Sequence, residues 1–135
     1  MESLRDERVD LEVVASDLVY QGAVWDVRSD TVRYGDGEMT RQYVEHPGAA
    51  AVVALDDDGR VVLIQQYRQP IKERDWEIPA GLLDIAEESP VETAKRELSE
   101  EVDLAADRWQ HLVSIHTTPG GNDEVVHLFL ARGLS

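Results

Sequence analysis

The stretch that begins at Ser89 restricts the possible folds most, because it carries the start signal and the apolar stripe of an amphipathic helix. Ser89 is a good N-cap, Pro90 suits the first helical position, and Glu92 completes a capping box with Ser89. We expect the helix to run to about Glu101 or Val102. One side of it is apolar and should pack on a core. The residues on that side are Val91, Ala94, Leu98 and Val102.

Three glutamates crowd one side of the last two turns of this predicted helix. Glu100 is three residues and Glu101 four residues after Glu97, so the carboxylates are neighbours on the helix surface. Their repulsion adds to the unfavourable position of negative charge at the C-terminal end of a helix. A hard divalent cation such as Mg²⁺ or Mn²⁺ removes this repulsion, because it prefers oxygen ligands. The alternative is a solvated acidic face, which composition alone favours in a chain this acidic.

The order of residues around the helix favours the metal site. Residues 81–104 contain a glycine, a loop, and then Arg96-Glu97 followed by Glu100-Glu101, and this stretch resembles the Nudix box of metal-dependent diphosphate hydrolases. Two positions depart from the family pattern: six residues rather than five separate Gly81 from Glu88, and Asp103 stands where the family has glycine. We expect Glu88 rather than Glu87 to be the first glutamate of the motif, because its spacing to the arginine is kept. We also expect a positive φ at Asp103, which Asp tolerates better than most residues.

Composition fits a single domain and excludes several classes of protein. The chain has 135 residues, of which 42% are hydrophobic and 30% charged, and it has neither a long apolar stretch nor a signal-peptide pattern. We therefore expect a cytoplasmic protein with no membrane partner. Cysteine is absent, which excludes disulfides and thiolate metal sites. The formal net charge of −15 argues against a nucleic-acid partner, and any phosphate substrate would need bound cations and well-placed arginines.

Short β-like segments on both sides of the helix predict a layered α/β or α+β domain. The expected strands are residues 12–14, 19–28, 31–34, 39–44, 49–55, 61–67, 76–78, 109–117 and 125–131. Hairpin turns are predicted at Gly35-Asp36-Gly37 and at Asp57-Asp58-Gly59. The family resemblance implies a Nudix-type α/β/α sandwich around a mixed sheet. It divides the chain into an N-terminal antiparallel β segment, residues 1–45, and a catalytic domain, residues 46–135, which we expect to lack a C-terminal strand and helix.

Four further motifs lie outside or next to the box: Val44-Glu45-His46, Gln66-Tyr67-Arg68, Trp76-Glu77-Ile78-Pro79-Ala80-Gly81 and Pro119. Together they resemble the bacterial ADP-ribose pyrophosphatase branch of the family. The resemblance implies Mg²⁺-dependent hydrolysis of ADP-ribose to AMP and ribose 5-phosphate, by a homodimer whose subunits exchange the N-terminal β segment. Other nucleoside diphosphate sugars, NADH and dinucleotide polyphosphates are alternative substrates, because the box does not encode recognition of the base. A non-catalytic nucleotide-binding regulator and an acidic Ca²⁺-buffering protein are alternatives of other classes.

The resemblance also assigns roles to individual residues. Arg96 is expected to orient Glu100 within the catalytic site. Glu124, in the loop after Pro119, is expected to position or deprotonate the attacking water; a box glutamate is the alternative base, and a solvated turn is the alternative for the loop. The expected ligands of Mg²⁺ or Mn²⁺ are Glu97, Glu101, Glu88 and the carbonyl oxygen of Ala80.

Four residues are expected to bind the substrate. Arg68 follows an apolar strand and is placed to contact phosphate, unless it only pairs with Glu73 or Glu77. Arg41 matches a position that reaches the partner's site in relatives, and Trp25 can stack on adenine or serve as core or interface. Glu77 is expected to bind a ribose hydroxyl or to support the metal site.

Overall fold

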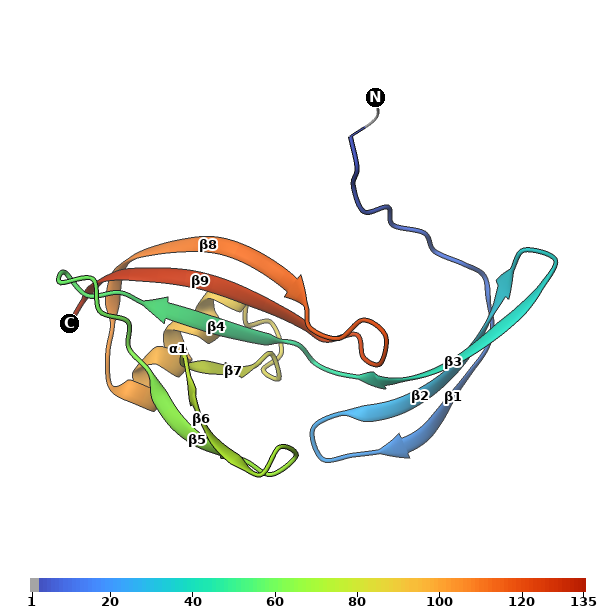
Figure 1. The fold of residues 1–135 in the computed structure, drawn as a ribbon, viewed down its shortest axis with the longest axis horizontal. Coiled ribbons are helices and arrows are strands. Elements are labelled where there is room, and N and C mark those ends of the chain that lie inside the picture. The colour runs from blue at the N-terminus through green and yellow to red at the C-terminus, as the bar shows by residue number, and fades with distance from the viewer. Residues whose placement is uncertain (1–2) are drawn as a thin grey trace.

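The computed structural model describes residues 3–135 as a small N-terminal sheet that leads into a mixed sheet packed on one helix (Figure 1). The N-terminal sheet has the order β1-β2-β3 and is antiparallel throughout. It extends away from the rest of the chain, and its third strand runs directly into the central sheet. The bounds are β1 (Val13–Gln21), β2 (Asp26–Tyr34) and β3 (Gly37–Glu45).

A turn at residues 22–25 divides the run that the sequence predicted as one strand from 19 to 28. The N–H of Gly22 donates to the carbonyl oxygen of Trp25 at 3.0 Å. A Cβ at residue 22 would collide with that same oxygen, so the tight turn requires glycine. The prediction missed it because residues with high strand propensity lie close by on both sides, Val19 and Tyr20 before the glycine and Val24 and Trp25 after it. The predicted hairpin at Gly35 is confirmed, and Gly35 has a φ of 57°.

The central sheet has the order β7-β4-β9-β8 and is mixed. Its two middle strands are parallel, whereas each outer strand is antiparallel to its neighbour. Alternate residues of the middle strands face the helix and form the core with it, among them Val52, Phe129 and Ala131. The bounds are β4 (Ala49–Ala54), β7 (Ala80–Leu82), β8 (Ala106–His116) and β9 (Val125–Leu134).

A separate hairpin of β5 (Ile64–Arg68) and β6 (Glu73–Glu77) lies beside the central sheet. The predicted turn at residues 57–59 does form, and the Asp56 carboxylate accepts the N–H groups of Asp58 and Arg60. After a single bridge between Leu55 and Val61, however, the chain leaves β4 and pairs with β6 instead. Trp76 of this hairpin is 66% exposed.

The helix α1 (Pro90–Val102) has the ends that the sequence predicted. The hydroxyl of Ser89 accepts the N–H of Glu92 at 3.3 Å, while the Glu92 carboxylate pairs with Lys95. At the other end Asp103 has a φ of 54°, so the positive φ expected there is confirmed. The N–H of Asp103 donates to the carbonyl of Ser99, and the N–H of Leu104 donates to the carbonyl of Leu98. Ala94 and Leu98 are fully buried.

The α/β fold class is confirmed, with α1 on one face of the central sheet. Within residues 3–135 α1 is the only helix, so this stretch supplies one of the two helical layers of the expected sandwich. None of the described residues forms a helix long and apolar enough to cross a membrane.

Candidate active site

A cavity of about 390 Å³ opens where the end of α1, the strand β7, the hairpin strand β5 and the loop before β9 meet. It brings together segments that are far apart in the chain. Its chemistry is mixed, because acidic, basic and imidazole side chains all face the same space. The groups used below are His46, Arg68, Ala80, Gly81, Glu101 and Glu124.

Glu97 lies directly against the backbone of β7. Its carboxylate and Cγ occupy the space that a Cβ at Gly81 would need, so the close approach of helix and strand requires glycine there. The Glu97 side chain is 15% exposed and accepts a hydrogen bond from the guanidinium of Arg96 at 2.9 Å. Packing against β7 and the hydrogen bond from Arg96 thus restrict the position of the Glu97 carboxylate.

Glu101 is held one residue away along the same strand. Its Oε2 accepts the backbone N–H of Ala80 at 3.0 Å. Partial desolvation raises the pKa of Glu101, and the nearby negative charge of Glu97 raises it further, although the Ala80 hydrogen bond acts in the opposite direction. Two carboxylates that repel each other beside a cavity form an arrangement that a cation would stabilise.

Arg96 contacts three carboxylates on the helix surface, including that of Glu97. It donates to Glu88 at 3.0 Å through one terminal nitrogen, and to Glu97 and Glu100 at 2.9 and 3.1 Å through the other. These partners, Glu88 first, hold the pKa of Arg96 well above its ordinary value. In return, the hydrogen bonds from Arg96 and then Thr93 lower the pKa of Glu88. The predicted orienting contact between Arg96 and Glu100 is therefore present, and Arg96 also fixes Glu88.

Arg68 and Glu77 form a two-pronged ion pair across the β5–β6 hairpin. The Arg68 Nε and one terminal nitrogen donate to the two Glu77 oxygens at 2.8 and 2.6 Å. This pairing raises the pKa of Arg68 and lowers that of Glu77. Arg68 still lines the cavity and its side chain is 47% exposed. Arg68 is therefore paired with Glu77 and lines the cavity, and its contact with phosphate stays a prediction.

Glu124 enters the cavity from the loop before β9. Its Oε2 accepts the hydroxyl of Thr117 at 2.8 Å, and its Oε1 lies 3.6 Å from Nε2 of His46. The loop itself is tied to the end of β3, because Val44 donates to the Gly121 carbonyl and accepts from the Asp123 N–H. A polar loop that the sequence alone left open as a solvated turn is therefore anchored, with its glutamate directed inwards.

Comparison with known proteins decides the family. The family model of the NUDIX domain matches residues 45–135. An ADP-ribose pyrophosphatase of Mycobacterium tuberculosis is 50% identical over 126 residues, which cover 93% of this chain and 61% of that protein. The chain belongs to the Nudix family. A methanol dehydrogenase activator of Bacillus methanolicus is 38% identical over 92% of this chain and 67% of its own length. The crystal structure of an ADP compounds hydrolase superposes with a TM-score of 0.77 over 97% of this chain and 71% of that one, at 23% identity, which supports the fold.

Of the predicted metal ligands, the structure places Glu97, Glu101 and Ala80 together and Glu88 elsewhere. Glu97 and Glu101 meet at β7 beside Ala80, whereas Glu88 is bound to Arg96, which also contacts Glu97 and Glu100. No group of three or more acidic, histidine or cysteine side chains within residues 3–135 is arranged to hold a metal ion alone. Two carboxylates nevertheless fit Mg²⁺, which commonly keeps several water ligands and takes one or two from the protein. The ligand set therefore stays a prediction centred on Glu97 and Glu101.

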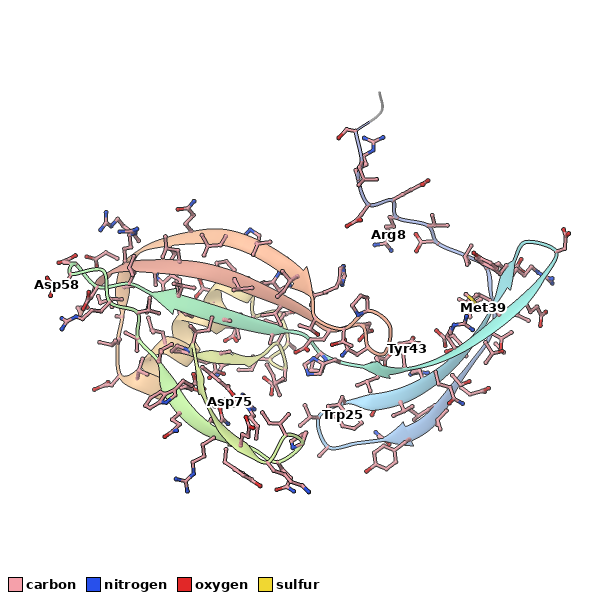
Figure 2. All side chains as sticks on the ribbon, in the orientation of Figure 1. Arg8, Trp25, Met39, Tyr43, Asp58 and Asp75 are labelled. Atoms are coloured by element: carbon pink, nitrogen blue, oxygen red, sulfur yellow. The ribbon has the colours of Figure 1, made fainter. Side chains whose placement is uncertain are left out.

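Two of the predicted substrate residues lie outside this cavity. Arg41 lines a separate hollow with Pro119 and Asp123, and its guanidinium donates to the carbonyl of Thr40. Trp25 sits at the end of the N-terminal sheet, in the turn between β1 and β2, and is 42% exposed (Figure 2). Neither residue belongs to the Nudix domain that the family model matches.

His46 is the site residue that sequence reasoning did not assign. His46 lines the cavity beside Glu124. The sequence did point to His46, because it belongs to the triplet Val44-Glu45-His46 that carries the resemblance to the ADP-ribose pyrophosphatase branch, but the resemblance gave the histidine no role. Its contact partner is distant in the chain, so spacing alone does not reveal it.

Proposed function

We propose that this Nudix domain hydrolyses the diphosphate bond of ADP-ribose to AMP and ribose 5-phosphate with Mg²⁺ or Mn²⁺. One observation carries the proposal: the box glutamate Glu101, the arginine Arg68 and the loop glutamate Glu124 line a single cavity, and the box glutamate Glu97 lies against Gly81 in its wall. Diphosphate hydrolysis needs charge neutralisation on the phosphates, a group that accepts a proton from water, and fixed positions for both. The similarity to the mycobacterial ADP-ribose pyrophosphatase supports the choice of substrate.

The chemistry assigns a separate task to each group. A bound Mg²⁺ would neutralise phosphate charge and polarise the phosphorus, with Glu97 and Glu101 as its protein ligands. Arg68 would exchange part of its pairing with Glu77 for a phosphate oxygen, since guanidinium binds both anions in the same geometry. The water oxygen bonds to one phosphorus, and the bond from that phosphorus to the bridging oxygen breaks. Glu124 accepts the proton that the water loses.

Activity of the purified protein tests the proposal. The protein is incubated with Mg²⁺ and, separately, with ADP-ribose, GDP-mannose, NADH and diadenosine polyphosphates, and nucleoside monophosphates are separated by chromatography. We expect release of AMP from ADP-ribose to be much faster than release from the other compounds. Faster release from a different compound would contradict ADP-ribose as the substrate but would still support diphosphate hydrolysis as the reaction. Glu101→Gln should abolish release, whereas Glu92→Gln, on the exposed side of α1, should leave it unchanged.

The role of Glu124 is tested separately from metal binding. Glu124→Gln keeps the shape of the side chain but removes its basicity, so we expect turnover to fall about 100-fold or more while Mg²⁺ affinity, measured by calorimetry, stays constant. Near-normal turnover of Glu124→Gln would exclude the loop glutamate and leave a box glutamate as the base.

A second candidate is a regulator that binds nucleotide without hydrolysing it. The specific observation in its favour is the similarity to the methanol dehydrogenase activator. A folded protein that binds ADP-ribose in calorimetry but releases no monophosphate from any compound of the panel would favour this candidate over the enzyme.

We also propose that the protein is a homodimer built through its N-terminal sheet. Within residues 3–135 the strand β1 lies at the edge of its sheet, and it exposes apolar side chains, with Val19 at 55% and Tyr20 at 60%. Arg41 and Trp25 lie away from the cavity of their own chain, and in a dimer they would contribute to the cavity of the second subunit. Light scattering should report a dimer.

Subunit mixing tests the shared site. Arg41→Ala and Glu101→Gln are each expected to be inactive alone. Unfolding and refolding them together should restore about a quarter of wild-type turnover, because half of the dimers would then contain one intact site. No recovery in a dimeric mixture would contradict a site built from two subunits.

A further inference from the structure

His46 is fixed by its backbone and by one ring nitrogen. The His46 N–H donates to Asp123 Oδ1 at 2.8 Å, which joins the end of β3 to the loop that carries Glu124. Its Nδ1 accepts the N–H of Gly48 at 2.9 Å. A backbone amide can only donate, so Nδ1 carries no proton and the proton of a neutral ring is on Nε2.

The protonated nitrogen faces the loop glutamate. Nε2 of His46 lies 3.6 Å from Oε1 of Glu124, and the two side chains are only 15% and 23% exposed. The other oxygen of Glu124 is held by the Thr117 hydroxyl at 2.8 Å. The carboxylate is thus restrained from both sides at the wall of the cavity that contains Glu101. Distances between catalytic groups are often long without ligand and shorten in the reacting complex.

We propose that His46 is a positioning residue for Glu124, and that its Nε2–H directs the carboxylate towards the substrate's attacking water. The inference rests on the proposed function for its effect on turnover, but the contact itself can be tested without substrate. Glu124 belongs to a loop, and loop side chains move unless other groups restrain them. A restraint on the carboxylate reduces the cost of reaching the reactive geometry.

The two nitrogens of His46 have separate tasks, so two conservative variants separate them. His46→Asn places an oxygen near the Nδ1 position and can still accept the Gly48 N–H, but it has nothing to offer Glu124. His46→Gln places an amide N–H near the Nε2 position and loses the acceptor for Gly48. Gly48 has a φ of 87° and packs against Leu83, so a purely structural histidine should suffer most from loss of the Gly48 contact.

Turnover of these variants is the first test. If His46 positions Glu124, His46→Asn should lower kcat by about 10- to 100-fold with little change in KM, the usual effect of losing a group that orients a catalytic residue. His46→Gln should recover most of that loss. Combined with Glu124→Gln, His46→Asn should cause no further loss. The exposed His116, as His116→Asn, is the matched control and should retain full kcat. Equal kcat values for the Asn and Gln variants, or a change in KM alone, would overturn the proposal.

Nitrogen NMR of the imidazole is the second test and needs no substrate. In ¹⁵N-labelled protein we expect the proton of neutral His46 on Nε2, and Glu124→Gln should shift the Nε2 resonance while the corresponding resonances of His116 stay in place. A proton on Nδ1, or no response to Glu124→Gln, would overturn the proposal. If no compound of the panel is hydrolysed while the NMR result is as expected, the proposed function fails but the contact between His46 and Glu124 stands.

Discussion

Glu97 occupies the space that a side chain at Gly81 would fill. A Cβ built on Gly81 would overlap with the carboxylate and Cγ of Glu97, which come from the helix that packs over this strand. The glycine of the box is therefore needed for close approach between a helix carboxylate and a strand, in addition to any freedom it gives the loop. The position of Glu97, a predicted metal ligand, therefore depends on the absence of a side chain at Gly81.

Gly81→Ala should displace Glu97 without unfolding the protein. The atoms that a new methyl group would meet are at the far end of a flexible side chain, which can rotate away. We expect Mg²⁺ affinity to fall and turnover to drop about 100-fold, because a displacement of about 1 Å in a catalytic site has that effect. Calorimetry with Mg²⁺ and the AMP assay measure both quantities. Gly37→Ala, which meets nothing within 4 Å, is the control, and an equal loss in both variants would contradict this account.

Leu98→Ala should destabilise the protein by about 2–5 kcal/mol, because Leu98 is fully buried between the helix and the central sheet. Leu112→Ala, at a position that is 45% exposed on β8, should cost about 0.5 kcal/mol or less. Unfolding of both variants in urea, followed by fluorescence, gives the two free energies. Similar losses at the two positions would mean that the core lies elsewhere.

Local signals explain which parts of the fold the sequence could predict. The start of α1 depends on Ser89 and Pro90, its end on Asp103, and the carboxylate cluster on helical spacing; all of these interactions are made within a few residues of one another. The hairpin at Gly35 is local in the same sense. Because each signal and its structure lie side by side in the chain, a single sequence contains enough information to place them.

Interactions between distant segments explain what the sequence could not predict. The strand that begins at Ile64 pairs with β6 rather than with β4, and that choice depends on packing between segments rather than on the residues of the strand. His46 lies beside Glu124 because the loop that carries Glu124 is hydrogen-bonded to the end of β3, and no spacing in the sequence predicts this contact. The residues of the N-terminal sheet likewise do not predict its role, because the role of an exposed apolar edge depends on the surface that packs against it.

Asp103→Gly should stabilise the protein by up to about 1 kcal/mol. Asp103 has a φ of 54°, a conformation that costs a residue with a Cβ about 1 kcal/mol, and its negative charge lies at the unfavourable end of α1. Asp103→Asn removes only the charge and should therefore give a smaller gain, which separates the two causes. Thermal unfolding measures both. If Asn gave the full gain of Gly, charge rather than backbone conformation would be the cause.

Tyr43 should titrate with a pKa of about 12, compared with its ordinary value of 10.0. Burial raises the pKa first, and the hydrogen bond that its hydroxyl donates to Asp30 at 2.9 Å raises it further. The proton is held more tightly in the folded protein than in the unfolded chain, so the resulting stability is complete below pH 10 and is lost as pH rises towards about 12.

The difference between wild type and Tyr43→Phe isolates this group from the other tyrosines. The absorbance of tyrosinate, followed as a function of pH, should show one late titration in the wild type that is missing in the variant. The stability advantage of the wild type over Tyr43→Phe, measured by urea unfolding, should decrease over the same pH interval, because the unfolded wild type loses its Tyr43 proton first. A constant advantage across that interval would mean that neither burial nor Asp30 perturbs Tyr43 in solution, and that the pairing of β2 with β3 is looser around this residue than the structure describes.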